Sequence, residues 1–424
     1  MNGGPMDVII VGAGIGGLTA ALALHQVGIN ARVYDSAEDI RELGVGINLL
    51  PHATKILDAY GVLDALTAIA IETKDLTYFN KFGQTIWSEP RGIEAGYRWP
   101  QLSIHRGALQ TALLRTAQER LGAERIFTGH HLTRIGPSSA GRLHAHFISR
   151  ATGAPVAAES ADLLIGADGI HSVTRSQFYP SEGPPKWSGA VVWRAVSETP
   201  PFLSGRSMVV IGHTNRFIAY PISKPHAVRG VSLVNWVAEI AMEPNKPYRR
   251  EDWNRRGQLG DVLPQFENFC FDWIDVPAIM RAAEAIYEFP RLDRDPLQRW
   301  TFGRVTLLGD AAHPMYPMGS NGASQAILDA SALADALGAN SDIDRALAAY
   351  EAARRPAATE VVISNRNEGP AQILAIVEER APHGFDNIEA VISSVELAEI
   401  SSRYKRLAGF DQVTVNANPL ARRS

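Results

Sequence analysis

The sequence predicts an α/β protein in which a dinucleotide-binding domain is interrupted by a second domain built on a mixed β-sheet. Three observations support this fold class. An apolar strand near residue 10 leads directly into a glycine-rich loop and a helix. Two later apolar strands, at residues 162–168 and 304–310, each end in an aspartate. Between these two strands, β-rich runs without regular intervening helices predict a sheet of their own.

The first element is a buried strand followed by a phosphate-binding turn. Residues 7–11 are mostly β-branched, as expected for a strand buried on both faces of a parallel sheet. Gly12 permits the tight turn, Gly14 leaves room for a pyrophosphate, and Gly17 lets the helix expected at residues 18–27 pack closely. The next strand ends on Asp35, an acid suited to a ribose diol. This pattern predicts a dinucleotide site but does not distinguish FAD from NAD.

Three later segments resemble those of the group A, single-component FAD-dependent aromatic monooxygenases. They are Leu164–Ser172, Leu307–Gly322 and Ser103–Leu113. The resemblance extends to about Glu368 and is closest to members that act on phenazine carboxylates. It implies a Rossmann-like FAD-binding domain, an inserted mixed β-sheet substrate domain of the p-hydroxybenzoate-hydroxylase type, a helical C-terminal segment, and FAD held without a covalent bond.

The resemblance also implies roles for single residues. Asp310 would hydrogen-bond the ribityl chain of FAD, and Arg106 would bind the pyrophosphate through its planar guanidinium. Asp168-Gly169 would lie between the pyrophosphate and the nicotinamide donor, although an Asp-Gly pair taken alone favours an ordinary turn. The expected cofactor contacts are Gly12, Gly14, Ile15, Gly16, Gly17, Asp35, Ser36, Val45, Gly46, Arg106, Leu132, Asp168, Gly169, Asp310, Pro317, Gly319, Ser320, Asn321, Gly322 and Ala323.

The segment after Asp310 is expected to hold the flavin ring. Pro317–Gly322 precedes a helix predicted at residues 323–337, and the N–H groups at a helix start suit an anion such as the reduced isoalloxazine. Members of the family usually carry Gly-Gln-Gly here, whereas this chain has Ser320-Asn321-Gly322. The departure leaves a backbone role intact and weakens any side-chain assignment.

Composition limits the possible functions. The chain has 424 residues, of which 46% are hydrophobic and 20% charged, with a net charge of −4. These values fit a globular protein of two domains and give no electrostatic case for nucleic-acid binding. The single cysteine, Cys270, excludes intramolecular disulfides and cysteine-based zinc clusters. We see no secretory signal and no apolar run of about 18 residues, so a cytoplasmic location without membrane contact is expected.

Changes of pattern along the chain suggest domain boundaries. A hairpin is expected around Lys81–Gly83, and the final stretch is mostly helical up to about Lys405, followed by a polar tail. The strands of the inserted sheet are expected at residues 189–196, 208–212, 217–221 and 230–237. We assign residues 1–75, 100–182 and 300–354 to the FAD-binding domain, 76–99 and 183–299 to the substrate domain, and 355–424 to the C-terminal segment and tail.

The substrate pocket is expected between the domains, at the carboxyl ends of the parallel strands. The candidate lining residues are Trp193, Arg194, Tyr220, Trp236, Met315, Tyr316 and Pro317. Aromatic side chains in such strands are also common in plain cores. An arginine within an apolar strand, such as Arg194, must reach solvent, pair with an acid, or meet an anionic ligand. The sequence leaves these three possibilities open.

The resemblance implies an enzyme that uses NADH or NADPH and O2 to hydroxylate an aromatic or N-heteroaromatic acid through a flavin C4a-hydroperoxide, with or without decarboxylation. A flavin halogenase and a Baeyer–Villiger oxygenase are alternatives, but their motifs Trp-x-Trp-x-Ile-Pro and Phe-x-Gly-x-x-x-His do not occur. A non-catalytic FAD-binding sensor is a third. The expected partners are a small aromatic substrate and O2, for a monomer or a homodimer.

His313 is expected to orient the cofactor loop. The adjacent His130 and His131 point to opposite faces of a strand, which argues against a shared metal.

Overall fold

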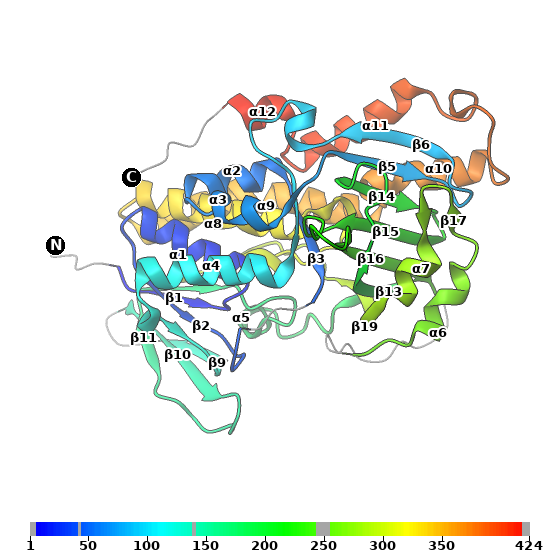
Figure 1. Ribbon diagram of the computed structural model, residues 1–424. Helices are drawn as coiled ribbons and strands as arrows, with labels where there is room; N and C mark the ends of the chain where they lie inside the picture. Colours follow the sequence, from blue (N-terminus) through cyan, green and yellow to red (C-terminus); the bar gives the residue numbers. More distant parts are fainter. Residues whose placement is uncertain (1–5, 41–43, 138–140, 243–254, 418–424) are drawn as a thin grey trace.

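A six-stranded sheet forms the centre of the cofactor-binding half of the molecule (Figure 1). The computed structural model describes residues 6–40, 44–137, 141–242 and 255–417. The strand order is β20-β21-β12-β1-β2-β8, and all pairs except β20–β21 are parallel. The bounds are β1 Val8–Val11, β2 Ala31–Tyr34, β8 Ile126–Phe127, β12 Leu163–Gly166, β20 Thr301–Phe302 and β21 Val305–Leu307. All four residues of β1 are buried, as its β-branched composition predicts.

Helices cover one face of this sheet and a small sheet covers the other (Figure 1). Val8 and Ile10 point into a core with the helices, whereas Ile9 and Val11 pack against a three-stranded antiparallel sheet. The helices are α1 Ile15–Gln26, α2 Pro51–Ala59, α3 Leu63–Ile69, α4 Arg106–Leu121, α8 Gly322–Ala339 and α9 Ile343–Arg366; α5 is Val173–Phe178. The small sheet consists of β9 His130–Pro137, β10 Leu143–Ser149 and β11 Glu159–Ala161.

The inserted domain is a seven-stranded mixed sheet, in the order β19-β13-β16-β15-β14-β5-β6. The expected hairpin is confirmed as β5–β6, and the four expected strands overlap β13, β14, β15 and β16, with ends that differ by a few residues. Sequence reasoning missed β19. The bounds are β5 Asp75–Phe79, β6 Thr85–Pro90, β13 Lys186–Thr199, β14 Ser207–Ile211, β15 Asn215–Pro221, β16 Ser232–Ala241 and β19 Ala283–Asp293.

The two faces of the inserted sheet have different neighbours. Helices α6 (Leu259–Val262) and α7 (Val276–Arg281) close one face with a core that contains Phe266 and Met280. The other face meets the C-terminal helices and a second three-stranded sheet, which carries the Gly46 segment. That sheet consists of β3 Gly46–Leu49, β4 Ile71–Glu72 and β7 Leu102–His105, and a separate hairpin pairs β17 Cys270–Phe271 with β18 Ile274–Asp275.

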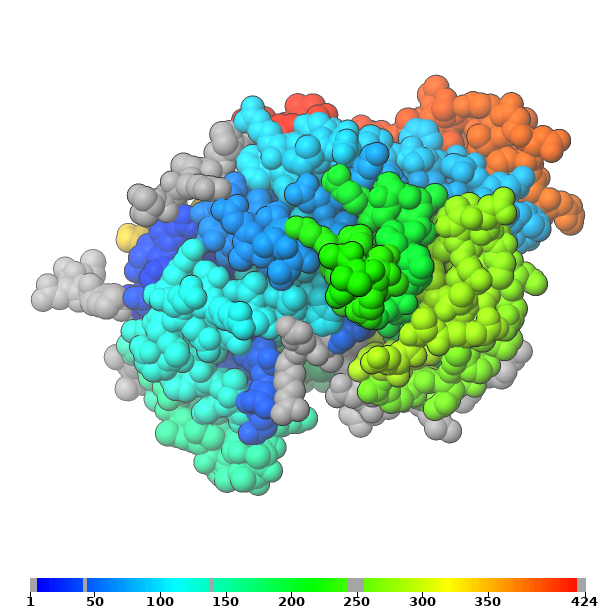
Figure 2. All heavy atoms as spheres, in the orientation of Figure 1, coloured from blue at the N-terminus to red at the C-terminus, as the bar shows by residue number. Residues whose placement is uncertain are grey.

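The C-terminal segment packs on this second face of the inserted sheet, over β5, β6 and β14. Helix α9 runs through the proposed boundary at residues 354 and 355 without a break and contains Pro356. It is followed by α10 Gln372–Arg380, α11 Ser394–Leu407 and α12 Gln412–Ala417. The chain after Lys405 therefore contains a further helix where a polar tail was expected, and residues 418–424 lie outside the described part. In Figure 2 the orange C-terminal segment borders the cyan residues of β6.

Buried polar contacts hold the C-terminal segment in place. The carboxylate of Glu89 on β6 is nearly inaccessible and pairs with Arg91 and with Lys405 of α11, 2.8 Å away. Ser401, also on α11, donates to the same carboxylate at 2.6 Å.

Among the described helices, none is long and apolar enough to cross a bilayer.

Candidate cofactor and substrate site

The glycine-rich loop after β1 has the geometry that a pyrophosphate requires. A Cβ on Gly12, whose φ is +107°, would lie 2.3 Å from the carbonyl oxygen of Ala167, and one on Gly17 would lie 1.9 Å from that of Gly12. A Cβ on Gly14 would meet no atom within 4 Å. Gly12 and Gly17 are thus required by packing, while Gly14 faces open space at the start of α1. These residues fit a dinucleotide on the N-terminus of that helix.

Two more residues of the first fingerprint have packing or polar roles. Gly16 lies against the residue that follows β21, since a Cβ there would be 2.8 Å from the Leu308 side chain. Asp35 follows β2, and its carboxylate accepts hydrogen bonds from the N–H groups of Ala13 (2.6 Å) and Ala37 (2.8 Å). The carboxylate is therefore anchored to the glycine-rich loop and keeps lone pairs for a further donor. Ser36 is exposed beside it.

Arg106 is the most unusual charge of the site. It opens α4, its backbone N–H donates to Val45 (2.8 Å), and within the described residues its guanidinium makes neither a hydrogen bond nor an ion pair. Burial, and then the nearby cation Arg194, lower the pKa of Arg106, while Asp310 opposes them. Arg106 is only partly exposed, and a desolvated arginine without an acidic partner is costly, so this position suits an anionic ligand.

Asp310 follows the carboxyl end of β21 and lies within the 3₁₀ turn Gly309–Ala311. Its side chain is accessible, yet the surrounding protein raises the pKa of the carboxyl, an effect opposed by His313 and Arg106. The Asp310 carboxyl is therefore open to solvent but largely surrounded by protein. This is the environment expected for a group that contacts a bound ligand.

A buried network behind Asp310 positions the turn, and sequence reasoning found only one of its members. Asp329 on α8 accepts from the Gly309 N–H at 3.0 Å, from His313 at 2.5 Å and from Arg354 at 2.8 Å. His313 and Arg354 outweigh the burial and lower the pKa of Asp329 to about 2. His313 is thus engaged in the structural network, as expected for a residue that orients the loop. Arg354 also donates to Gln325 at 2.6 Å. Gln325 and Asp329 are four residues apart on the predicted helix, and this pair of polar residues on one helix face was the signal that sequence reasoning missed.

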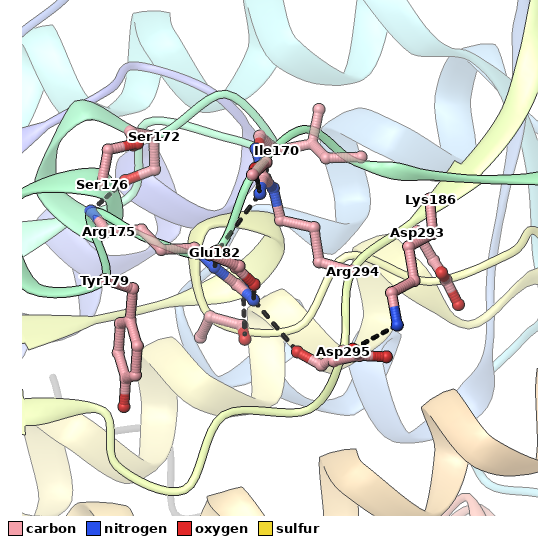
Figure 3. A network of polar contacts seen from close by, with 12 residues as sticks. Ile170, Ser172, Arg175, Ser176, Tyr179, Glu182, Lys186, Asp293, Arg294 and Asp295 are labelled. Carbon is pink, nitrogen blue, oxygen red and sulfur yellow. Dashed lines mark hydrogen bonds and ion pairs between the residues drawn. The ribbon is translucent and has the colours of Figure 1, made fainter.

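Asp168-Gly169 adjoins a second polar network, which includes Ser172 and is shown in Figure 3. Asp168 accepts from the Ser172 hydroxyl (2.5 Å) and the Thr174 N–H (3.0 Å), so it stabilises the start of α5. Gly169 has a φ of +77°, as a turn requires. The ordinary-turn interpretation therefore accounts for the contacts of this pair in the structure.

The same network joins the second and third fingerprints. The guanidinium of Arg175 is buried, pairs with Glu182 and donates to the carbonyls of Ala311 (3.2 Å) and Ala312 (3.1 Å), directly after Asp310. Arg294 donates to the carbonyl of Ile170 at 2.8 Å (Figure 3). Nothing in the sequence indicated this role for Arg175, because the contact joins residues 136 positions apart.

The segment of Val45 and Gly46, both expected cofactor contacts, is held by the inserted sheet. The N–H of Gly46 donates to Oδ1 of Asn235 on β16 (2.6 Å), and its carbonyl accepts from Arg194 on β13 (2.7 Å). A Cβ on Gly46 would be 2.6 Å from that of Asn235, so the glycine is required by this contact. Arg194 thus meets a backbone carbonyl and faces Arg106. Sequence reasoning missed Asn235, which is fully buried.

The structure divides the expected pocket residues between the two faces of the inserted sheet. Trp193 and Trp236 are 5% and 0% exposed in the core closed by α6 and α7, so we remove them from the candidates. Adjacent residues of a strand point to opposite faces, and Arg194 therefore faces the cofactor side. Tyr220 lies there too, hydrogen-bonded to Arg194 and buried with Tyr316. Burial raises the pKa of Tyr220, and Arg194 opposes it.

The remaining candidates lie around the loop after Asp310. Arg291 covers the ring of Tyr316 at 4.9 Å, Met315 is half-buried and Pro317 is exposed. Gly322 is the first residue of α8, and a Cβ there would have only one neighbour, 4.0 Å away, which leaves the helix start open. Leu132 is 2% exposed in the core under the parallel sheet, so its side chain does not reach a ligand.

Comparisons of the sequence and of the fold with known proteins agree with the cofactor site described here. A family model described as an FAD binding domain matches residues 5–258 and 287–365. The chain is 46% identical over 392 residues to the phenazine 1,6-dicarboxylic acid hydroxylase PhzS of Lysobacter antibioticus, covering 92% of this chain and 96% of that protein. It is 31% identical over 387 residues to a 3-hydroxybenzoate 6-hydroxylase of Polaromonas naphthalenivorans, covering 87% and 89%. A solved salicylate hydroxylase substrate complex shares the fold, with a TM-score of 0.73 at 22% identity over 97% of each chain.

Proposed function

The chain belongs to the FAD-binding family of flavin-dependent aromatic monooxygenases, and we propose that it uses NADH or NADPH and O2 to hydroxylate a planar N-heteroaromatic acid of the phenazine-carboxylate type. The 46% identity to a phenazine dicarboxylic acid hydroxylase over 92% of the chain supports this substrate class. The acid either gains a hydroxyl group or exchanges a carboxyl for one.

We assign the cofactor to the residues that were described above at the carboxyl ends of the parallel strands. Gly12, Gly14 and the start of α1 would hold the pyrophosphate together with Arg106, and Asp35 would hold the ribose. Asp310 would bind the ribityl chain, and the start of α8 would face the isoalloxazine. When bound, FAD supplies the redox chemistry, accepting hydride from the nicotinamide and passing one oxygen atom of O2 to the substrate while the other leaves as water.

The observation that carries the substrate assignment is the pair of cations at the junction of the two domains. Arg194 lies close enough to lower the pKa of Arg106, and neither guanidinium pairs with an acid within the described part of the chain. Arg106 is assigned to FAD, which leaves Arg194 for the carboxylate of the substrate. Its present partners are the Gly46 carbonyl and the Tyr220 hydroxyl, both weaker acceptors than a carboxylate.

The protein's own contributions to the reaction are positioning and exclusion of water. Tyr220, which is buried and hydrogen-bonded to Arg194, would provide an aromatic wall for a planar acid. The N–H groups at the start of α8 stabilise negative charge on the reduced ring. The partners in this proposal are the aromatic acid, the nicotinamide and O2, and the enzyme acts in the cytoplasm as a monomer or homodimer.

The test is a coupled assay on the purified holoprotein. NADH and NADPH oxidation should be slow alone and rise by orders of magnitude with phenazine-1,6-dicarboxylate or phenazine-1-carboxylate. Incubation with ¹⁸O2 should place one labelled atom in the product, detected by mass spectrometry. Stimulation by 3-hydroxybenzoate but not by the phenazines would overturn the substrate class. Absence of oxygenation with every aromatic acid would overturn the monooxygenase assignment.

A further inference from the structure

We propose that helix α11 positions the loop that faces the flavin ring, through the hydroxyl group of Tyr404. This inference rests on the proposed function, because it concerns the loop assigned to the isoalloxazine. It gives the C-terminal segment a role in cofactor chemistry.

The loop has a backbone that needs external support. Gly319 has a φ of +65° and Ser320 a φ of +57°, so two successive residues adopt the left-handed region. Serine is disfavoured there, and such conformations persist only where the surroundings hold them. The two residues directly precede Asn321 and the start of α8, so their conformation determines where the first N–H groups of that helix point.

Tyr404 provides the support. Its side chain is 3% exposed, and its hydroxyl lies 3.1 Å from the Met318 carbonyl and 2.9 Å from Oδ1 of Asn365, both acceptors for its proton. The hydroxyl in turn accepts from Nδ2 of Asn321 at 3.1 Å. One hydroxyl group thus contacts residues on both sides of the left-handed pair.

The contact also explains why residue 319 is glycine. A Cβ there would lie 2.4 Å from the Tyr404 hydroxyl and 2.5 Å from its ring. The approach of α11 to the loop is therefore closer than any other residue would allow. Asn365 extends the support, because its Nδ2 donates to the Tyr316 carbonyl at 2.9 Å.

Helix α11 is anchored independently of the loop. Lys405 and Ser401 bind the buried Glu89 of β6, and Leu397 and Ile400 pack into the core with the inserted sheet. A second contact joins the first turn of α8 to the end of α11, because Gln325 donates to the carbonyl of Ala408, the residue after α11, at 3.0 Å. The inserted sheet, α11 and the flavin-facing loop thus form one connected support.

The consequence is a specific role for a residue that touches no substrate. Loss of the hydroxyl would free the loop and misalign the N–H groups that stabilise charge on the reduced ring. Reduced flavin carries that charge and oxidised flavin does not, so the reduced form should lose more binding. Tyr404 is therefore a positioning residue.

The test compares Tyr404→Phe with Tyr97→Phe. Tyr97 is a matched control, because it is also buried and its hydroxyl donates to the Phe410 carbonyl (2.6 Å) in the same C-terminal segment, with no hydrogen bond to the loop. Three quantities are measured for each variant: FAD affinity by titration of the apoprotein, the midpoint potential of the bound flavin, and the melting temperature.

We expect Tyr404→Phe to weaken FAD binding about two- to tenfold, as the loss of hydrogen bonds implies. Its potential should fall, by about 30 mV if the reduced form loses tenfold more binding than the oxidised form. Tyr97→Phe should lower only the melting temperature. Asn365→Ala, which removes the support from its other side, should shift affinity and potential in the direction of Tyr404→Phe.

Equal effects of Tyr404→Phe and Tyr97→Phe, with unchanged potential and affinity, would overturn this inference and leave the proposed function standing. The same conclusion holds if Asn365→Ala binds FAD like the wild type. Failure of the wild-type chain to bind FAD would overturn the proposed function, and this inference with it.

Discussion

Replacement of Arg106 by methionine should have opposite effects on cofactor binding and on the stability of the apoprotein. The guanidinium is assigned to the FAD pyrophosphate, and a charge-assisted hydrogen bond of this kind is worth about 1.5–3 kcal/mol. Arg106→Met should therefore weaken FAD binding about tenfold to a hundredfold. Methionine keeps much of the length and apolar volume of the stem, so the start of α4 should keep its packing.

The apoprotein should not lose stability through the same substitution. Burial and Arg194 lower the pKa of Arg106 below its value in the unfolded chain. The charged form is thus disfavoured in the folded state at every pH below the lowered pKa, which includes neutral pH. Removal of the charge relieves that cost, and the melting temperature of the apoprotein should stay constant or rise.

Arg32→Met is the matched control. Arg32 lies near the opposite end of the parallel sheet, on β2, and pairs with Asp7 and Glu159. Its loss should lower the melting temperature, at a cost of about 1.5–3 kcal/mol, without a change in FAD affinity. Both variants are compared by thermal unfolding of the apoprotein and by fluorescence titration with FAD. A destabilised Arg106→Met apoprotein with wild-type FAD affinity would refute the assignment and make Arg106 a structural residue.

Three further outcomes are expected. Asp310→Ala should lower FAD occupancy in the purified, yellow protein, and wild-type affinity in a flavin titration would exclude the ribityl assignment. Arg194→Met should raise KM for the aromatic acid far more than for an uncharged analogue, whereas equal increases would point to packing against the Gly46 segment. Asp329→Asn should destabilise the protein by about 3–5 kcal/mol, because it leaves Arg354 buried and unpaired. The folded-state pKa of Asp329, about 2, lies below its unfolded value, so its contribution is present above about pH 4 and should be lost between about pH 4 and 2 in acid-unfolding experiments.

Much of the cofactor-binding half could be predicted because its signals are local. A β-branched strand, three glycines at fixed spacing, a helix and an acid are determined by neighbours within about one βαβ unit, so their order in the sequence carries their geometry. The structure agrees in detail: Gly12 and Gly17 are required by contacts, and Gly14 faces open space. The expected hairpin and the four expected strands of the inserted sheet followed from turn residues and alternation in the same way.

The substrate side could be predicted only in part. The alternation of side chains along a strand shows which residues share a face of the sheet, but it does not show which elements cover that face. Trp193 and Arg194 are adjacent and must point in opposite directions, so they could not both line one pocket. The position of helices α6 and α7 determines which face is the core, because these helices bury Trp193 and Trp236. The opposite face, with Arg194, Tyr220 and Asn235, is turned toward the cofactor side.

The sequence by itself determined the cofactor fold, the residues of its fingerprints and the family to which the chain belongs. Only the tertiary structure decided which contacts hold those fingerprints together. Arg175 reaches the carbonyls after Asp310, and Tyr404 reaches the loop at Met318, 86 positions earlier. No local pattern encodes such contacts, because each depends on two separately folded segments that meet when their apolar faces are buried.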